Sequence, residues 1–444
     1  MQSRALSPAL PAVSLPSVRP ASDSMRAASW WQIWRIDPVV VLTVAGRCLG
    51  TVAGLAGSML TARYLQPAGR GEYFVALTTA QLVAQFGNLG LQSGNTYFVA
   101  RDRSLFSPLL ANSLWISFFG APVMGVVLLL ASLWGTSGTA SPAVGWFAVA
   151  LAPLFVFNLL GSGLFVGLNQ IKTYSLMQPL SAIIVLPFIL VAALLGCGPA
   201  GFLTASLLAW TLTIGIMVYL LLRQSNGVGG FRPDVFMTAS RYSTKVYFAT
   251  LAGFVVLRMN VFILHALGGA EQVGYYSIAS QVADTLSILP QSIATVLFPR
   301  LVTNQIGRLK ATVRDALRTA AIMSAVCAGV WLLAEPAVHL VFGPRFAPAV
   351  PVLRAMLPAV FLLGVMSVVS QYLAASGFPM AVVGCWLGAV VVCGGLGHGL
   401  IERHGAVGAS QALSATYGLL LAALLFLCWR TARAEPRHPR PLGD

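Results

Sequence analysis

Long apolar runs alternate with short polar breaks along most of the chain. Each run approaches the roughly 20 residues that a helix needs to cross a bilayer, and none shows the short alternating pattern of a transmembrane barrel strand. The pattern therefore predicts an all-α polytopic membrane protein with about twelve transmembrane helices. We place these helices at residues 39–61, 73–99, 109–133, 143–167, 175–196, 201–222, 242–267, 275–299, 315–334, 351–375, 379–400 and 405–428.

The chain contains an internal repeat. Gly71-Glu-Tyr-Phe-Val-Ala76 at the start of the second span recurs as Gly274-Tyr-Tyr-Ser-Ile-Ala279 at the start of the eighth, an offset of 203 residues. Six helices separate the two copies, so both have the same orientation. This predicts two six-helix lobes related by a pseudo-twofold axis along the membrane normal. The expected divisions are a disordered cytoplasmic tail and interfacial anchor at 1–38, an N-terminal lobe at 39–222, a cytoplasmic linker at 223–241, a C-terminal lobe at 242–428 and a cytoplasmic tail at 429–444.

Composition and charge agree with a membrane location. The chain is 57% hydrophobic and only 9% charged, with a mean hydropathy of +0.81. A net charge of +15 would suit a nucleic-acid partner, but no soluble domain is present to carry it. Lys and Arg instead concentrate in alternate loops, which predicts cytoplasmic termini and no nucleic-acid binding. The opposite side is assigned only Arg63, Arg70, Arg345, Arg354 and Arg403.

Two predicted spans carry polar side chains at helical spacing. In the second span five amides are expected on one face, namely Gln81, Gln85, Asn88, Gln92 and Asn95. A matching stripe in the eighth span consists of Ser277, Gln281, Asp284, Ser287, Gln291 and Thr295. Such amides can simply join helices through hydrogen bonds. Their number favours a hydrated cavity between the lobes, where transporters built from repeated lobes bind their substrate.

Charged residues inside the spans are the strongest candidates for function. Arg258 and Asp284 each lie about nine residues, or roughly 14 Å, from the loop that their helices share. They are predicted to form an ion pair, either as a static bridge or as part of substrate binding or gating. Arg47 in the first span has no acidic partner at its depth, so we expect it to bind an anionic group unless it snorkels to the interface. Asn260, two residues beyond Arg258, is a weaker cavity candidate.

Several motifs resemble those of a known transporter family. Residues 62–73, Gly87-Asn-Leu-Gly90 and Tyr97-Phe-Val-Ala-Arg101 resemble the first hairpin of bacterial oligosaccharide flippases, and Arg258-Met-Asn260, Val273-Gly-Tyr-Tyr-Ser277 and Leu297-Phe-Pro-Arg300 resemble their second-lobe hairpin. These flippases form the Wzx-type branch of the multidrug/oligosaccharidyl-lipid/polysaccharide exporter superfamily. The chain departs from a common family pattern at Asn260, where an acidic residue often stands.

The resemblance implies a V-shaped pair of six-helix bundles in the bacterial inner membrane. It implies a flippase that moves undecaprenyl-diphosphate-linked oligosaccharide from the cytoplasmic to the periplasmic leaflet in exopolysaccharide, capsule or O-antigen biosynthesis. The implied partners are this lipid-linked oligosaccharide, membrane lipids, glycosyltransferases and a polysaccharide polymerase. No cofactor is expected, and the coupling ion, H⁺ or Na⁺, stays open. A peptidoglycan lipid-intermediate flippase is a variant of the same reading.

Two other functions are open at this point. A cation-coupled multidrug exporter would need an anionic cavity, for which Asp284 is the available acid. A membrane glycan polymerase or ligase would need a large periplasmic loop, but the segment at about 335–350 offers only His339 and Arg345. The sequence contains no HExxH, GxSxG or P-loop motif, so we expect a transporter and not an enzyme.

Overall fold

The chain is helical throughout the part that the structure describes. The computed structural model describes residues 38–434 except 128–141, 226, 228, 304–307, 377 and 378. Its main helices are α1 (Pro38–Gly87), α2 (Leu91–Arg101), α3 (Phe106–Trp115), α5 (Pro142–Gly167), α6 (Ile171–Leu194), α7 (Pro199–Leu222), α8 (Pro233–Thr303), α9 (Arg308–Phe342), α10 (Ala349–Ala375) and α11 (Met380–Ala434). A 3₁₀ turn, η2 (Arg103–Leu105), precedes α3, a π turn, η3 (Ile116–Gly120), follows it, and a second 3₁₀ turn, η4 (Pro344–Phe346), precedes α10.

Three of the long helices are broken in the middle, so that each can cross a membrane twice. Non-helical backbone interrupts α1 at Gln66, α8 at Gly269 and α11 at Gly405. Among the described residues, eight helices are long and apolar enough to span a membrane, or nine if the bent pair formed by α1 and α2 counts as one. With the breaks taken into account, these helices match the predicted spans in order and position, which confirms the all-α polytopic fold.

The internal repeat is visible in the backbone at the turns. Gln66 (φ 59°, ψ 175°) and Gly269 (φ 75°, ψ −179°) have nearly the same left-handed conformation and are separated by the repeat offset. Each repeated glycine packs directly against the backbone of the other hairpin. A Cβ at Gly71 would lie 1.7 Å from the carbonyl oxygen of Ala270. A Cβ at Gly274 would likewise lie 2.0 Å from the carbonyl oxygen of Pro67. This reciprocal glycine contact is what a pseudo-twofold axis between the two hairpins requires.

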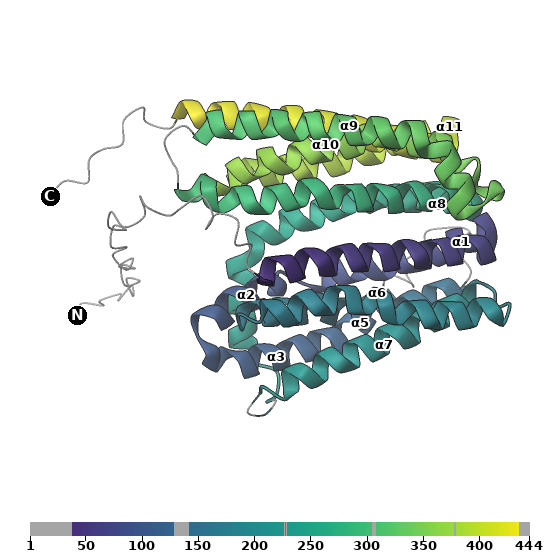
Figure 1. Cartoon of the computed structure of the whole chain (residues 1–444). Helices are drawn as coiled ribbons and strands as arrows, with labels where there is room; N and C mark the ends of the chain where they lie inside the picture. The colour runs from purple at the N-terminus through teal and green to yellow at the C-terminus, as the bar shows by residue number, and fades with distance from the viewer. Residues whose placement is uncertain are drawn as a thin grey trace, which may run out of the picture.

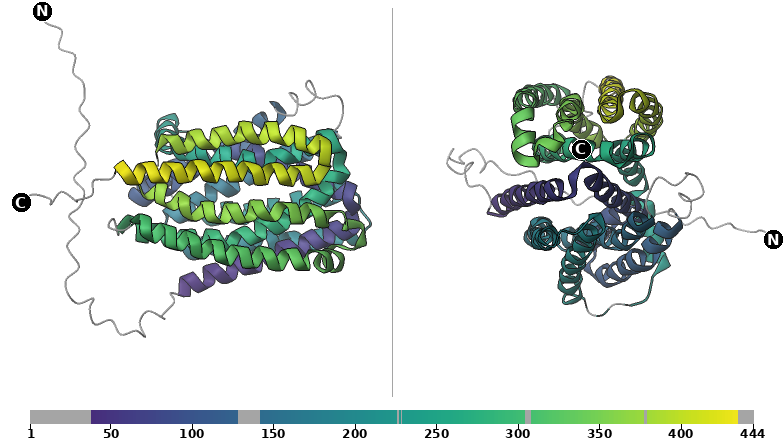
Figure 2. Two further views of the ribbon diagram at one scale, coloured as in Figure 1. Left: turned by 90° about the horizontal axis from the view of Figure 1, so that it is seen from above. Right: turned by 90° about the vertical axis from the view of Figure 1, so that its right-hand side faces the viewer.

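The helices form two groups with α1 and α8 in contact between them. In Figure 1 the helices α1 to α7 lie below and most of α8, with α9 to α11, lies above, and the end-on view of Figure 2 separates the same two bundles. We call the end that carries the breaks at Gln66, Gly269 and Gly405 the turn end. The opposite end, where α1 begins and α11 finishes, is called the terminal end (Figure 1). The two-lobed arrangement predicted from the repeat is therefore confirmed.

The first turns of α8 join the two lobes at the terminal end. The helix begins at Pro233, so residues 233–241 of the predicted linker are helical. The side chain of Asn112 in α3 donates to the carbonyl oxygen of Arg232 (3.0 Å) and accepts from its backbone N–H (2.7 Å). Tyr242 stacks on Tyr97 of α2 with ring centroids 4.1 Å apart. Contacts of both polar and aromatic kinds therefore hold the start of the second lobe on the first.

Candidate functional site

A cavity of about 250 Å³ lies between the two lobes. Residues from both halves of α1, from α6, from α7 and from α8 line it, so every one of these helices must keep its place for the cavity to exist. Apolar side chains form part of the wall. The polar side chains of the lining are Ser58, Thr61, Arg70, Tyr73, Thr78, Gln81, Ser181, Trp210, Arg258, Gln281 and Asp284.

The predicted ion pair between Arg258 and Asp284 is present at the cavity wall. The Nη2 atom of Arg258 lies 2.8 Å from Oδ2 of Asp284, and its Nη1 donates to Ser280 Oγ at 2.8 Å. The Arg258 side chain is only 11% exposed, whereas that of Asp284 is 38% exposed. The carboxylate is therefore the more accessible partner. Proton coupling through this carboxylate is a further hypothesis.

Arg70 is a second cationic group in the cavity that sequence reasoning did not find. It was assigned to a loop, but the helix resumes at Pro67 and Arg70 is 3% exposed. Its guanidinium donates to Ser58 through both the backbone carbonyl (2.9 Å) and the hydroxyl (2.7 Å), to the Thr61 hydroxyl, and to Ser277 Oγ (2.9 Å). All of these partners are neutral, so no carboxylate offsets the charge of Arg70 among its recorded contacts.

One face of α8 orients both guanidinium groups. Ser277 accepts from Arg70, Ser280 accepts from Arg258, and Asp284 pairs with Arg258. Spacings of three and four residues put these three side chains on one face of the helix. The two serines are one helical turn apart, about 4.5 Å along the axis. Arg70 belongs to the first lobe and Arg258 to the second, so the cavity brings one cation from each lobe together.

The predicted amide stripe is divided by a bend and does not lie on one face. Leu89 (φ 47°) and Gly90 (φ 80°) have left-handed backbone, and the helix bends by 50° between α1 and α2. Of the five predicted amides, Gln81 alone lines the cavity. The Oδ1 atom of Asn88 accepts from the backbone N–H of Gln92 at 2.9 Å and so satisfies one N–H of the first turn of α2, whose N-cap is Gly90. The expectation of five amides along one continuous face was wrong because the quartet Gly87-Asn-Leu-Gly90 ends the helix.

The other amides beyond and before the bend serve packing or lie outside the cavity lining. Asn95 is fully buried and donates to Ser113 Oγ (2.9 Å) and to the carbonyl oxygen of Leu160 (3.2 Å). Gln92 lies where α2 packs on α5, since a Cβ at Gly163 would come within 2.4 Å of its carbonyl oxygen. Gln85 is half-buried and does not line the cavity.

The remaining predicted cavity residues differ in whether they line the cavity. Gln281 lines the cavity, whereas Gln291 is exposed and lies outside it. Asn260 faces the interior of the second lobe, where its Nδ2 donates to the carbonyl oxygen of Ala409 at 3.2 Å. It is therefore not a cavity residue, because position 260 points away from the face that carries Arg258. Arg47 lies within α1, but its side chain is outside the described residues.

The site thus combines two guanidinium groups with one carboxylate among the described cavity residues. Arginine guanidinium groups form charge-assisted bidentate hydrogen bonds with carboxylates and phosphates. Within the described ranges, no group of three or more His, Cys, Asp or Glu side chains is placed to hold a metal ion. The described lining thus carries one more positive than negative charge and is suited to binding an anion.

Comparisons with known proteins agree with this architecture. Residues 39–305 match the family described as polysaccharide biosynthesis protein. The chain is 24% identical over 389 residues, covering 83% of this chain and 72% of the relative, to the succinoglycan biosynthesis transport protein ExoT of Rhizobium meliloti (strain 1021).

Two solved structures share the fold. The inward closed conformation of the lipid II flippase MurJ matches with a TM-score of 0.70 at 14% identity, covering 87% of each chain. An inward-facing multidrug resistance MATE family transporter of the MOP superfamily matches with a TM-score of 0.68 at 15% identity, covering 90% of this chain and 99% of the other.

Proposed function

The chain belongs to the polysaccharide biosynthesis protein family, and from this premise we propose that it is a flippase for undecaprenyl-diphosphate-linked oligosaccharide. It moves this lipid from the cytoplasmic to the periplasmic leaflet of the bacterial inner membrane by alternating access. The observation that carries the proposal is the pair of arginines, Arg70 and Arg258, that the two lobes contribute to one cavity. The relative named for succinoglycan biosynthesis supports a role in exopolysaccharide assembly.

The charge of the cavity favours a diphosphate over a cationic cargo. Asp284 offsets only one of the two guanidinium charges, so the lining keeps an excess of positive charge among the described residues. A buried charge is stable only when it is paired, hydrogen-bonded or hydrated. An anionic diphosphate brings negative charge to this lining, while its polyprenyl chain stays in the bilayer. Because the phosphates would contact both lobes, binding would also link the lobes mechanically.

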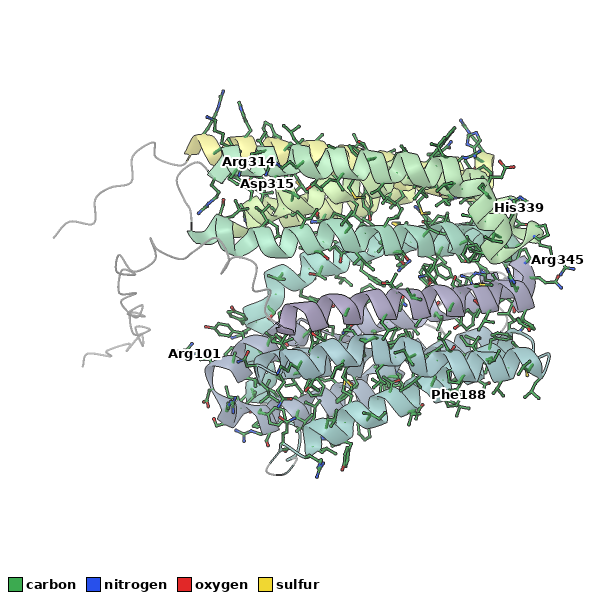
Figure 3. The ribbon with its side chains drawn as sticks, in the orientation of Figure 1. Arg101, Phe188, Arg314, Asp315, His339 and Arg345 are labelled. Carbon is green, nitrogen blue, oxygen red and sulfur yellow. The ribbon has the colours of Figure 1, made fainter. Side chains whose placement is uncertain are left out.

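The positions of the basic residues support an orientation in which the terminal end faces the cytoplasm. Arg101 and Arg314 lie at that end, and His339 and Arg345 lie at the turn end (Figure 3). In this orientation the turn end faces the periplasm and is closed by the reciprocal glycine contact. Arg63 closes it further, because its Nε and Nη2 donate to the carbonyl oxygens of Val341 (3.1 Å) and Leu340 (2.6 Å) at the end of α9. These contacts correspond to a state that is shut towards the periplasm.

Flipping of a fluorescent undecaprenyl-diphosphate oligosaccharide in proteoliposomes tests the proposal. The wild type is compared with Arg70→Gln and Arg258→Gln at matched protein levels, and with Arg403→Gln, an exposed arginine outside the cavity, as control. We expect each cavity variant to lose flipping by at least about tenfold, the equivalent of 1.4 kcal/mol, and the control to keep it. Wild-type rates in both cavity variants would refute the site.

The same proteoliposomes distinguish the competing functions. A wild type that flips no lipid-linked oligosaccharide but exports a cationic dye would replace the proposal with a multidrug exporter. A wild type that lengthens the glycan would instead indicate a membrane polymerase. Glycosyltransferases and a polysaccharide polymerase are the proposed partners, because a flippase receives its cargo from the first and delivers it to the second.

A further inference from the structure

Six polar side chains of the cavity lining take no part in the arginine network, and three of these are half-buried without a hydrogen bond to the described part of the protein. The three groups are the side-chain amides of Gln81 and Gln281 and the indole N–H of Trp210, which come from the second half of α1, from α8 and from α7. All three side chains are half-buried. Within the described residues, none of the recorded hydrogen bonds engages these groups. They are therefore available to a ligand that enters the cavity.

These groups lie at a depth similar to that of the ion pair. Counted from Gln66, Gly269 and Pro199 along their helices, Gln81, Gln281 and Trp210 lie about 16 to 22 Å from the turn end. The same count places Arg258 and Asp284 about 16 and 22 Å deep. A ligand whose phosphates contact Arg258 can therefore also reach the two amides and the indole, which line the same cavity at this depth.

The orientation of Trp210 is fixed by its neighbour. Phe155 in α5 meets the indole in an edge-to-face arrangement, with centroids 4.7 Å apart and an interplanar angle of 81°. An arrangement of this kind uses at most one of the two indole faces. The ring also borders the cavity. Trp210 thus presents a held aromatic surface to the same space as the two amides.

An uncharged, hydroxyl-rich ring matches this set of groups. Each glutamine amide both donates and accepts hydrogen bonds, as hydroxyl groups do. The negative face of an aromatic ring attracts the weakly positive C–H groups on one side of a pyranose. From this geometry we infer that Gln81, Gln281 and Trp210 form the subsite for the sugar attached directly to the diphosphate. The inference rests on the proposed function and deepens it.

The size of the cavity limits recognition to this first sugar. A volume of about 250 Å³ equals the space of about eight liquid water molecules. That space admits the diphosphate and one sugar ring but not an oligosaccharide. In this state the cavity therefore holds the sugar nearest the lipid.

Binding of two defined lipids to the purified protein in nanodiscs tests the subsite. The first is undecaprenyl diphosphate without sugar, and the second is the same lipid with one hexose attached. The variants are Trp210→Leu, Trp210→Phe and Gln81→Leu, and Trp146→Leu, an exposed tryptophan outside the cavity, is the control. Thermal unfolding of each variant confirms that it is folded.

We expect the wild type and Trp146→Leu to bind the hexose lipid more tightly than the sugar-free lipid. Trp210→Leu and Gln81→Leu are expected to reduce this preference by about tenfold, or 1.4 kcal/mol, with the affinity for the sugar-free lipid unchanged. Trp210→Phe, which keeps an aromatic face, should retain much of the preference. The expected change is in the ratio of two affinities, which a loss of packing alone does not alter.

Two results separate failure of this inference from failure of the proposed function. If the sugar-free lipid binds and Arg70→Gln weakens it, but no variant alters the sugar preference, the subsite is refuted and the flippase stands. If Trp210→Leu weakens both lipids equally, Trp210 is a packing residue and the inference also falls. If the wild type binds neither lipid, the proposed function itself is wrong.

Discussion

A single added methyl group at Gly71 should open the turn end of the protein. The Cβ of Gly71→Ala would lie 1.7 Å from the carbonyl oxygen of Ala270 and 3.1 Å from the backbone nitrogen of Gly274. Both neighbours are backbone atoms, so no side-chain rotation relieves the clash. Ordinary van der Waals contact begins at 3.4 Å, which means that the two hairpins must separate by about 1.7 Å. The closed arrangement of the turn end cannot accept the methyl group without this movement.

The size of the expected shift between closed and open turn ends follows from the usual free-energy cost of overpacking. Inserting a methyl group into a tightly packed contact costs about 1–3 kcal/mol. This cost falls only on the state in which Gly71 and Ala270 touch, so it shifts the equilibrium between closed and open turn ends by about 5- to 150-fold. Gly274→Ala should have a similar effect, because its Cβ would meet the carbonyl oxygen of Pro67 at 2.0 Å.

Distance measurement between spin labels on the two lobes gives the population of each state. Labels at Tyr64→Cys in α1 and Leu340→Cys in α9 occupy positions that are 49% and 76% exposed, in a background in which the six native cysteines are replaced. Gly71→Ala should move much of the distance distribution to longer values. Gly54→Ala on the same helix is the matched control, because its Cβ meets nothing within 4 Å. An unchanged distribution in Gly71→Ala, or an equal shift in the control, would refute the reasoning.

Three further changes probe the gate, the ion pair and the helix bend. Arg63→Gln removes two hydrogen bonds to the end of α9 and should favour the open turn end by about 1–3 kcal/mol, the sum for two bonds, in the same spin-label experiment; Arg403→Gln should not. Arg258→Met leaves the half-exposed Asp284 without its cation and should lower the free energy of unfolding in detergent by about 1–3 kcal/mol. The added change Asp284→Leu should restore part of this loss, and strictly additive losses would contradict the pairing. Asn88→Ala removes the acceptor of an N–H in the first turn of α2 and should lower the unfolding free energy by about 1 kcal/mol, whereas Gln85→Ala should be nearly neutral; equal losses would contradict this role of Asn88.

The order of the spans and the buried ion pair were accessible from the sequence. Long apolar runs determine where helices cross the bilayer, and the repeat at Gly71 and Gly274 predicted the division into two lobes. The meeting of Arg258 and Asp284 followed from depth alone, since both were counted from the same turn. These predictions rest on helix length and rise, which depend little on tertiary packing.

Arg70 and the bend at Gly90 were missed for identifiable reasons. A hydropathy pattern places the first polar residues of a helix outside the membrane, so Arg70 was assigned to a loop although Pro67 suits the first turn of a helix. The spacing of Arg70, Phe74, Leu77 and Gln81 along one face was a usable signal. The bend depends on left-handed backbone at Leu89 and Gly90, which the even spacing of the amides concealed. Asn260 could not be placed, because a helix count fixes depth but not the direction in which a side chain points.

The first segment of α8 is much longer than a helix needs to be to cross the bilayer core. From Pro233 to Gly269 it is about 54 Å long, whereas a bilayer core needs only about 30 Å. Its projecting end is fastened to the first lobe through Arg232 and Tyr242, while its middle carries Arg258 of the second. A rigid rotation of about 15° about the turn end, typical of known domain movements, would sweep the far end through about 14 Å. Hydrogen bonds of 2.7 and 3.0 Å cannot stretch over that range. The contacts of Arg232 with α3 and of Tyr242 with α2 must therefore break in such a rotation, unless α8 itself bends.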